Sequence, residues 1–116
     1  IAGAGATGRR VHAGVVQSKD SFYGQHSPAR MPTAAALAEK WEAWRRLGVL
    51  ASEMEAAALF TVGAARGLRT GAVFHVIWNQ ERAAAGLDTD ADESHDTSAA
   101  VRAAVEAIRK LSEKPD

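Results

Sequence analysis

Apolar and polar positions divide the first half of the chain into a strand, a polar stretch and a helix. Residues 11–17 (VHAGVVQ) are mostly apolar and predict a strand, whereas residues 18–32 are polar, contain one glycine and two prolines, and predict a loop. In residues 33–47, leucine and tryptophan recur every three or four positions, which is the spacing of one apolar helix face. Gly48 follows at the place where such a helix would end.

The second half of the chain predicts two strands, two helices and an acidic loop. We expect a short strand at residues 49–51 and a helix at residues 54–66. Residues 70–78 (TGAVFHVIW) form a nearly continuous apolar run, the pattern of a strand that is covered on both faces. Residues 79–94 are rich in acidic side chains and predict a loop, and residues 96–113 predict a last helix.

The alternation of strands and helices argues for an α/β fold. Buried strands at residues 11–17 and 70–78 need neighbouring strands and helices on both faces, and a chain with three strands provides few of them. We therefore expect residues 1–116 to form a single partial domain, which is part of a larger mixed sheet flanked by helices. The chain begins with Ile1 rather than methionine, and this agrees with the expectation.

Two short spacings resemble ligand-binding motifs but lack the context that these motifs require. Residues 3–8 have glycines at G-x-G-x-x-G spacing, but a strand follows them instead of preceding them, so we expect the end of a helix and a turn. Residues 88–92 have the D-x-D-x-D spacing of a calcium loop. An EF-hand needs glycine and glutamate where this chain has Glu93 and Ala99, so we expect a solvated loop and no metal site.

Charge and composition exclude several classes of function. Fourteen basic and fourteen acidic side chains give a net charge of zero, which provides no electrostatic footprint for nucleic acid or an anionic membrane. No apolar run approaches the roughly 20 residues of a membrane span. The chain has no cysteine, so disulfides and thiolate chemistry are excluded and a reducing cytoplasm fits. We expect a cytoplasmic protein with neither nucleic-acid nor membrane partners.

The strand-to-helix junction at residues 51–59 (ASEMEAAAL) is the first candidate for a binding site. Side chains at such a junction point out of the end of a sheet while their backbone stays fixed. Glu53 and Glu55 flank Met54 there. A structural alternative stays open, because Ser52 and Glu55 have the spacing of a capping box, in which both side chains bind backbone N–H groups at a helix start.

The polar stretch after the first strand offers a second set of binding side chains. They are an aromatic pair, an amide, an imidazole and a guanidinium, namely Phe22, Tyr23, Gln25, His26 and Arg30. Long polar loops after buried strands often carry binding sites. We therefore expect these side chains to take part in one.

Four segments, in order along the chain, carry a family resemblance: VHAGVVQSKDSFYGQ, WEAWRRLGVLASEMEAAALF, the run ending in VIWNQ, and ESHDTSAAVRAAVEA. Together they resemble the C-terminal half of the uridine phosphorylases, which belong to the nucleoside phosphorylase family. The resemblance covers almost the whole chain. It implies the C-terminal half of that family's α/β fold, a mixed sheet flanked by helices.

The resemblance also implies a reaction, the cleavage of the N-glycosidic bond of uridine by inorganic phosphate to give uracil and ribose 1-phosphate. It implies catalytic roles for two residues of this chain. Glu55 would hold the ribose 2′- and 3′-hydroxyls, and the Gln25 amide would pair with uracil. Phosphate would be the co-substrate, no cofactor is implied, and the full-length protein would be a homo-oligomer.

Five further contacts with the substrate follow from the same resemblance. Glu53 would lie near the base, Met54 would pack on the sugar, and Phe22 would cover both. Ile77 and Trp78 would line the base pocket.

The chain departs from the family's pattern in two respects. Many members have an arginine two residues after the glutamine, where it supports the leaving uracil; this chain has Ser27 there, with Arg30 and Arg82 as candidate replacements. The glycine-rich and arginine-bearing phosphate loops of the family lie in its N-terminal half, and nothing in this chain matches them. We therefore expect the chain by itself to be inactive.

Two other functions stay open. A purine nucleoside phosphorylase or nucleosidase of the same fold usually has an acid after the last core strand, where this chain has Asn79 and Gln80. Neither amide can act as that acid at neutral pH. The other function is that of a non-catalytic fragment or interaction module.

Overall fold

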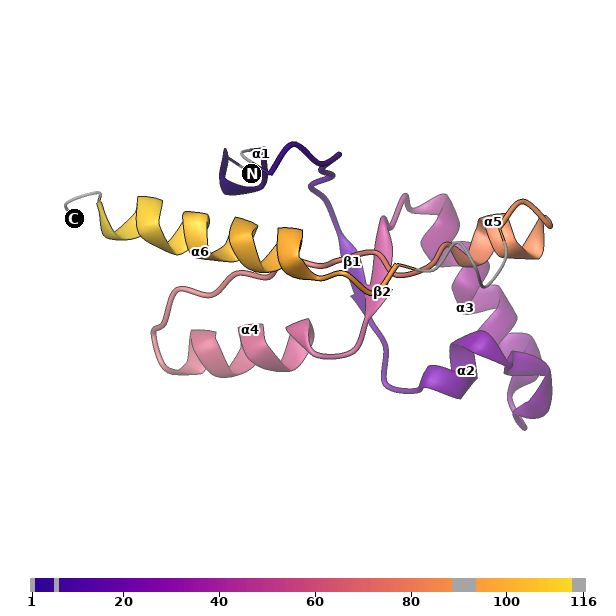
Figure 1. Cartoon of the computed structure of the whole chain (residues 1–116). Helices are drawn as coiled ribbons and strands as arrows, with labels where there is room; N and C mark the ends of the chain where they lie inside the picture. Colours follow the sequence, from indigo (N-terminus) through magenta and orange to yellow (C-terminus); the bar gives the residue numbers. More distant parts are fainter. Residues whose placement is uncertain (1, 6, 89–93, 114–116) are drawn as a thin grey trace. The chain divides into compact units, whose positions relative to one another are not determined.

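The computed structural model describes residues 2–5, 7–88 and 94–113, and the chain divides into two compact units (Figure 1). The first, which we call the sheet unit, is His12–Gly71. The second, which we call the terminal unit, joins Ile1–Val11 with Ala72–Asp116. That residues 1–116 form a single partial domain stays a prediction.

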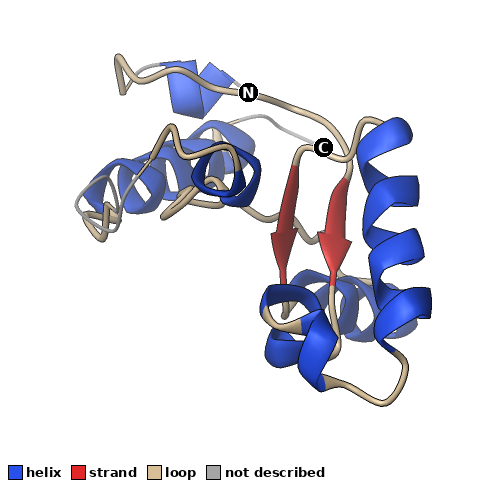
Figure 2. Ribbon diagram, turned by 90° about the vertical axis from the view of Figure 1, so that its right-hand side faces the viewer, coloured by secondary structure: helices blue, strands red, loops and turns tan. Residues whose placement is uncertain are grey.

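A two-stranded parallel sheet lies in the sheet unit. Its strands are β1 (Val16–Ser18) and β2 (Ala51–Glu53), and Figure 2 shows them running in the same direction. Ser18 pairs with Glu53 at the carboxyl ends of the strands. The Lys19 N–H then donates to the Glu53 carbonyl over 2.8 Å, which extends the ladder beyond β1.

The strands differ from the prediction in two ways: β1 is shorter than predicted, and β2 has the predicted length of three residues but begins two positions later in the chain. The strand predicted at residues 11–17 is confined to β1, and the strand predicted at 49–51 begins at Ala51 and continues to Glu53. Pairing register determines these limits, and register depends on the partner strand rather than on the local apolar pattern.

Two helices of the sheet unit agree with the prediction, α3 (Ala34–Arg46) and α4 (Ala56–Ala65). Each is followed by a glycine in the left-handed conformation, with φ of 72° at Gly48 and 66° at Gly67. Glycine adopts this conformation without steric cost, which ends the helix cleanly.

The loop predicted at residues 18–32 is wrong in part, because it contains α2 (Phe22–His26) and the short 3-10 helix η1 (Pro28–Arg30). The Ser21 hydroxyl accepts the Gly24 N–H over 3.0 Å and caps α2. Pro28 occupies the first position of η1, where a backbone N–H would have no partner within the helix, and proline has no N–H. Both short helices contact α3, as Figure 1 shows for α2.

The strand predicted at residues 70–78 is wrong, because these residues have no regular secondary structure. A strand needs a neighbour that pairs with its backbone groups, and in the described part of the chain β1 and β2 pair only with each other. Several apolar side chains of the segment are exposed, among them Val76 (63%) and Ile77 (45%).

The terminal unit contains α1 (Ala2–Gly5), α5 (Gln80–Ala84) and α6 (Ser98–Ser112), and α1 contacts α6. The helix α6 confirms the prediction for residues 96–113. The helix α1 and the turn after it confirm the helix end and turn expected from the glycines of residues 3–8.

The acidic loop predicted at residues 79–94 includes α5. The Asn79 side chain accepts the Arg82 N–H over 3.1 Å and caps this helix. Asp90 and Asp92, which carried the calcium spacing, lie outside the described residues, as does Glu93.

Few apolar side chains are buried in the described part of the chain. The buried apolar residues there are Ala56 and Ala103, which are 3% and 4% exposed. Large apolar side chains of α6 are also exposed, namely Val101, Val105, Ile108 and Leu111. No helix among the described residues has the length and hydrophobicity to cross a lipid bilayer.

Candidate functional site

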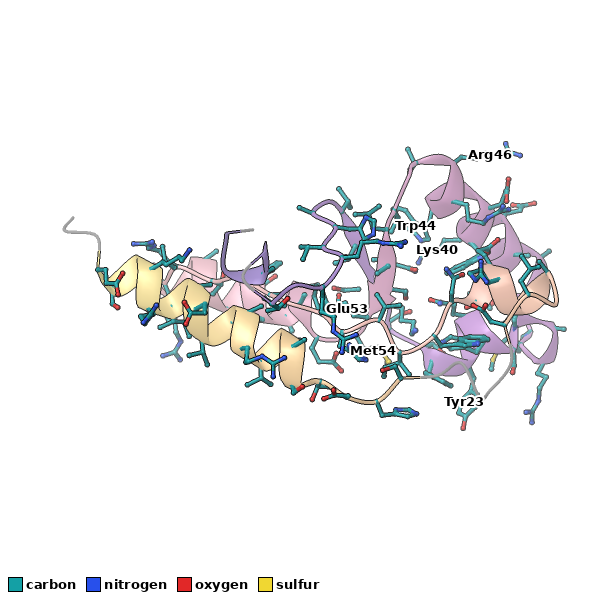
Figure 3. The ribbon with its side chains drawn as sticks, turned by 45° about the horizontal axis from the view of Figure 1, so that its top comes forward. Tyr23, Lys40, Trp44, Arg46, Glu53 and Met54 are labelled. Atoms are coloured by element: carbon teal, nitrogen blue, oxygen red, sulfur yellow. The ribbon has the colours of Figure 1, made fainter. Side chains whose placement is uncertain are left out.

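The carboxyl ends of β1 and β2 meet at one edge of the sheet, because the strands are parallel (Figure 2). Lys19 follows β1 toward α2, while Met54 and Glu55 follow β2 toward α4. Figure 3 shows Glu53 and Met54 at the end of β2. Open α/β sheets bind ligands at this edge. The predicted residues of the sheet unit other than Arg30 lie on the segments that border it.

Glu53 joins both strands to the start of α4. Its Oε2 accepts the backbone N–H groups of Glu55 and Ala56, each over 2.7 Å, and its Oε1 accepts the Ser18 hydroxyl. Burial raises the pKa of the Glu53 carboxyl, but the hydrogen bonds from Ser18 and the backbone and the charge of Lys19 outweigh burial and lower the pKa. Glu53 is therefore held as an anion.

The capping box considered for Ser52 and Glu55 does not form. Ser52 lies within β2, and the N-cap residue of α4 is Glu55, whose side chain makes no capping hydrogen bond. The strand continues to Glu53, so Ser52 is too early in the chain to reach the first turn of the helix. Glu53 binds the Glu55 N–H, which Ser52 would have bound in a capping box, and also the Ala56 N–H.

Glu55 and Met54 are exposed at the edge. Glu55 Oε2 accepts the Met54 N–H over 3.2 Å, and Met54 is 41% exposed. The Glu55 carboxylate faces solvent and can accept further hydrogen bonds from a ligand.

Gln25 is held against the end of β2. The Ser52 hydroxyl donates to Gln25 Oε1 over 2.7 Å, a bond between residues 27 positions apart in sequence. It fixes the amide of a residue on α2 relative to the strand that leads into Glu53, Met54 and Glu55. The structure therefore brings the predicted amide and the predicted carboxylates to the same edge.

An aromatic and cationic cluster lies beside Gln25. The rings of Phe22 and His26 are 4.2 Å apart, and Phe22 meets Tyr23 edge to face at 5.5 Å. Lys19 Nζ lies 3.2 Å from His26 Nε2 and 5.4 Å from the centre of the Phe22 ring. Phe22 is 51% exposed, so one side of its ring is open to a flat ligand.

The pKa values of Lys19 and His26 are both lowered, and the charge of Lys19 contributes to the shift of His26. Burial lowers the pKa of the Lys19 ammonium, and the carboxylates of Glu55 and Glu53 oppose this by raising it. Burial and the positive charge of Lys19 lower the pKa of His26. His26 is therefore neutral at pH 7, and its Nε2 accepts a hydrogen bond from the charged lysine.

A small cavity lies between β1, α2 and α3. Its volume is about 40 Å³, well below the roughly 300 Å³ of a small-molecule pocket, so a nucleoside cannot fit inside it. Among its lining atoms, Gln17 Oε1 and Trp44 Nε1 are buried without a hydrogen-bond partner in the described part of the chain. This cavity therefore does not define a site for a ligand of nucleoside size.

The remaining predicted residues lie elsewhere. Arg30 is exposed on η1 of the sheet unit. Ile77, Trp78 and Arg82 belong to the terminal unit, where Arg82 Nε binds the two oxygens of Asp88 over 2.8 and 2.9 Å. The roles given to these four residues stay predictions. Among the described residues, no three His, Cys, Asp or Glu side chains are grouped as metal ligands.

Sequence reasoning missed three residues of the edge: Ser18, Lys19 and Ser52. Their contacts depend on the pairing of Ser18 with Glu53, which no local pattern shows. Lys19 had one signal in the sequence, because it directly follows the first strand and precedes the aromatic pair.

Comparison with known proteins places this arrangement in a family. The sequence model described as "Phosphorylase superfamily" matches residues 1–113. The chain belongs to the phosphorylase superfamily, and its helices and small parallel sheet are part of that α/β fold. The family membership and the fold class predicted from sequence are thus confirmed.

Relatives within the family are named uridine phosphorylases. The chain is 57% identical over 98 residues to uridine phosphorylase of Treponema pallidum, a match that covers 84% of this chain and 37% of the relative. It is 35% identical over 116 residues to that of Klebsiella aerogenes and 36% identical over 119 residues to that of Escherichia coli. Both matches cover 96% of this chain and 44% of the relative, so the chain spans about two-fifths of their length.

Proposed function

We propose that this chain forms the nucleoside-binding half of a uridine phosphorylase, a pentosyltransferase. The enzyme would transfer the ribosyl group of uridine to phosphate and release uracil. The observation that carries the proposal is the 57% identity to the treponemal uridine phosphorylase, which extends over the segments that border the sheet edge. Gln25, Met54, Glu55 and the exposed ring of Phe22 provide the chemistry that a pyrimidine nucleoside needs.

Glu55 binds the sugar in this proposal. Its exposed carboxylate can accept hydrogen bonds from the ribose 2′- and 3′-hydroxyls, and charge-assisted bonds of this kind are short and strong. The sugar becomes oxocarbenium-like as the glycosidic bond lengthens. A nearby carboxylate therefore stabilises the transition state more than the ground state, which is the requirement for catalysis.

Gln25 and Phe22 bind the base. An amide presents a donor and an acceptor side by side and so matches the imide edge of uracil. The hydroxyl of Ser52 fixes the orientation of this amide through its bond to Oε1. The open face of Phe22 covers the flat ring, and Met54 packs on the sugar.

Phosphate is the co-substrate. The groups that bind it would come from the N-terminal half of the family's fold, which this chain does not match. No cofactor takes part. Assembly into a homo-oligomer and a cytoplasmic location belong to the same proposal.

A hybrid enzyme tests the proposal. It consists of this chain fused behind the part of the Treponema pallidum uridine phosphorylase that precedes the matched region. We expect uracil release from uridine that requires phosphate, with ribose 1-phosphate as the second product. Uracil release at the same rate without phosphate would indicate a nucleosidase, and a folded hybrid without activity would contradict the proposal.

A further inference from the structure

We propose that Lys19 is the cation that stabilises negative charge on the leaving base, the task left open by Ser27. The inference rests on the proposed function, because it concerns the leaving group of that reaction. It adds a catalytic residue that contacts the base, whereas the Glu55 carboxylate binds the sugar.

The reaction places negative charge on the base. The C1′–N1 bond of uridine breaks, its electron pair stays on N1, and the charge spreads onto the carbonyl oxygens of the ring. A phosphate oxygen forms the new bond to C1′. The proton that hydrogen phosphate carried passes through solvent to the base and completes neutral uracil. A cation beside the base therefore gains interaction energy as the bond breaks.

Lys19 occupies the right place for such a cation. Its backbone is fixed at the end of the sheet by the bond to the Glu53 carbonyl. Its Nζ lies 5.4 Å from the centre of the Phe22 ring and 3.2 Å from His26, the residue next to Gln25 on α2. The lysine ammonium thus lies beside the ring proposed to cover the base, and Lys19 and Gln25 line the same small cavity.

The neighbours of Lys19 leave it with hydrogen bonds to give. An ammonium group has three donors, and one of them is directed at the neutral imidazole of His26. Burial lowers the pKa of Lys19, and the charges of Glu55 and Glu53 oppose this by raising it. The lysine can therefore donate to a carbonyl oxygen of the base.

The arginine candidates fit the task less well. Arg30 is exposed on η1, and Arg82 is engaged with Asp88 in the other unit. Ser27 ends α2, where its N–H donates to the Tyr23 carbonyl over 2.9 Å, and its hydroxyl carries no charge. Lys19 combines a positive charge with partial burial next to Phe22.

Substrates with different leaving groups test this role in the hybrid enzyme. Fluorine at C5 makes uracil a better leaving group, so 5-fluorouridine needs less help from a cation. We expect Lys19→Met to lower kcat/KM about 100-fold with uridine and only about tenfold with 5-fluorouridine, the scale of one lost electrostatic donor. Lys19→Arg should recover part of the loss, because it restores the charge.

Two controls and a second readout separate the outcomes. Lys110→Met removes an exposed lysine of α6 and should leave both substrates unaffected, while Arg30→Met tests the competing arginine. Inhibition by 5-nitrouracil, which is an anion at neutral pH, should weaken in Lys19→Gln more than inhibition by uracil does. Equal losses with both nucleosides, or a selective loss in Arg30→Met instead, would overturn the role of Lys19. An inactive parent hybrid would overturn the proposed function.

Discussion

Glu53 and Glu55 are two residues apart and have opposite surroundings. Glu53 is bound by a hydroxyl and two backbone N–H groups, whereas Glu55 is an exposed N-cap residue with one weak contact to Met54 N–H. The first carboxylate is engaged by the fold, and the second can accept further hydrogen bonds. The resemblance assigned both of them to the substrate, and these two roles stay predictions.

Changing Glu55 to glutamine should affect catalysis and leave stability unchanged. In the hybrid enzyme we expect Glu55→Gln to lower kcat/KM for uridine about 100-fold, which corresponds to roughly 3 kcal/mol of lost transition-state stabilisation. The physical reason is the loss of charge-assisted bonds to the ribose hydroxyls. The melting temperature should stay the same, since Glu55 makes no capping bond. Unchanged kinetics would remove Glu55 from the site.

At the scale of secondary structure, the start of α4 depends on Glu53. Replacing a side chain that caps a helix costs about 0.5–2 kcal/mol. We expect Glu53→Gln to destabilise the hybrid by about 1 kcal/mol in urea unfolding at pH 7. Glu39→Gln, which changes an exposed glutamate of α3, is the matched control and should cost nothing measurable.

The pH dependence of this difference follows from the lowered pKa of Glu53. A carboxyl whose pKa is lower in the folded protein stabilises it fully above the unfolded value of about 4.3 and loses this contribution as pH falls through the folded value. The difference in the free energy of unfolding between the parent and Glu53→Gln should therefore shrink below about pH 4. A difference that grows under acid conditions would contradict the assignment.

The helices were predictable from sequence because their signals are local. The spacing of leucine and tryptophan in α3 and the glycines after α3 and α4 act over a few residues. The strand at residues 70–78 was not predictable in this way, because an apolar run becomes a strand only when other strands pair with it. The helix α2 was missed because the polar composition outweighed the cap at Ser21.

The candidate site was predictable as a set of residues but not as a network. Gln25 and residues 53–55 stand out by type and by their place after strands. The bond from Ser52 to Gln25 and the position of Lys19 depend on how β1 and β2 pair, which a single sequence does not show.

At the scale of the whole molecule, the exposed apolar surface indicates missing neighbours. Val73 and Phe74 are 44% and 40% exposed. On α6, Val101, Val105 and Ile108 are 57%, 57% and 68% exposed. A chain that spans about two-fifths of its relatives lacks the surfaces that would cover these side chains. The resemblance also implies that the phosphate loops of the family lie outside this sequence.

The 116-residue chain by itself should therefore not catalyse phosphorolysis. We expect no uracil release when the purified chain is incubated with uridine and phosphate, under conditions in which the hybrid enzyme is active. Turnover at even about 1 s⁻¹, the low end for ordinary enzymes, would show that no essential part is missing.

The preference for the base decides whether this chain reads a pyrimidine nucleoside. The measurement is kcat/KM of the hybrid enzyme for uridine and for inosine, in the parent and in Gln25→Ala. A purine lacks the imide edge that the Gln25 amide would pair with, at a cost of about 1–3 kcal/mol for each buried group left unsatisfied, and Asn79 provides no acid for a purine leaving group. We predict that the parent prefers uridine by about 100-fold, and that Gln25→Ala lowers uridine cleavage without creating inosine cleavage. Equal rates with the two nucleosides in the parent, or unchanged uridine kinetics in Gln25→Ala, would contradict the pyrimidine assignment.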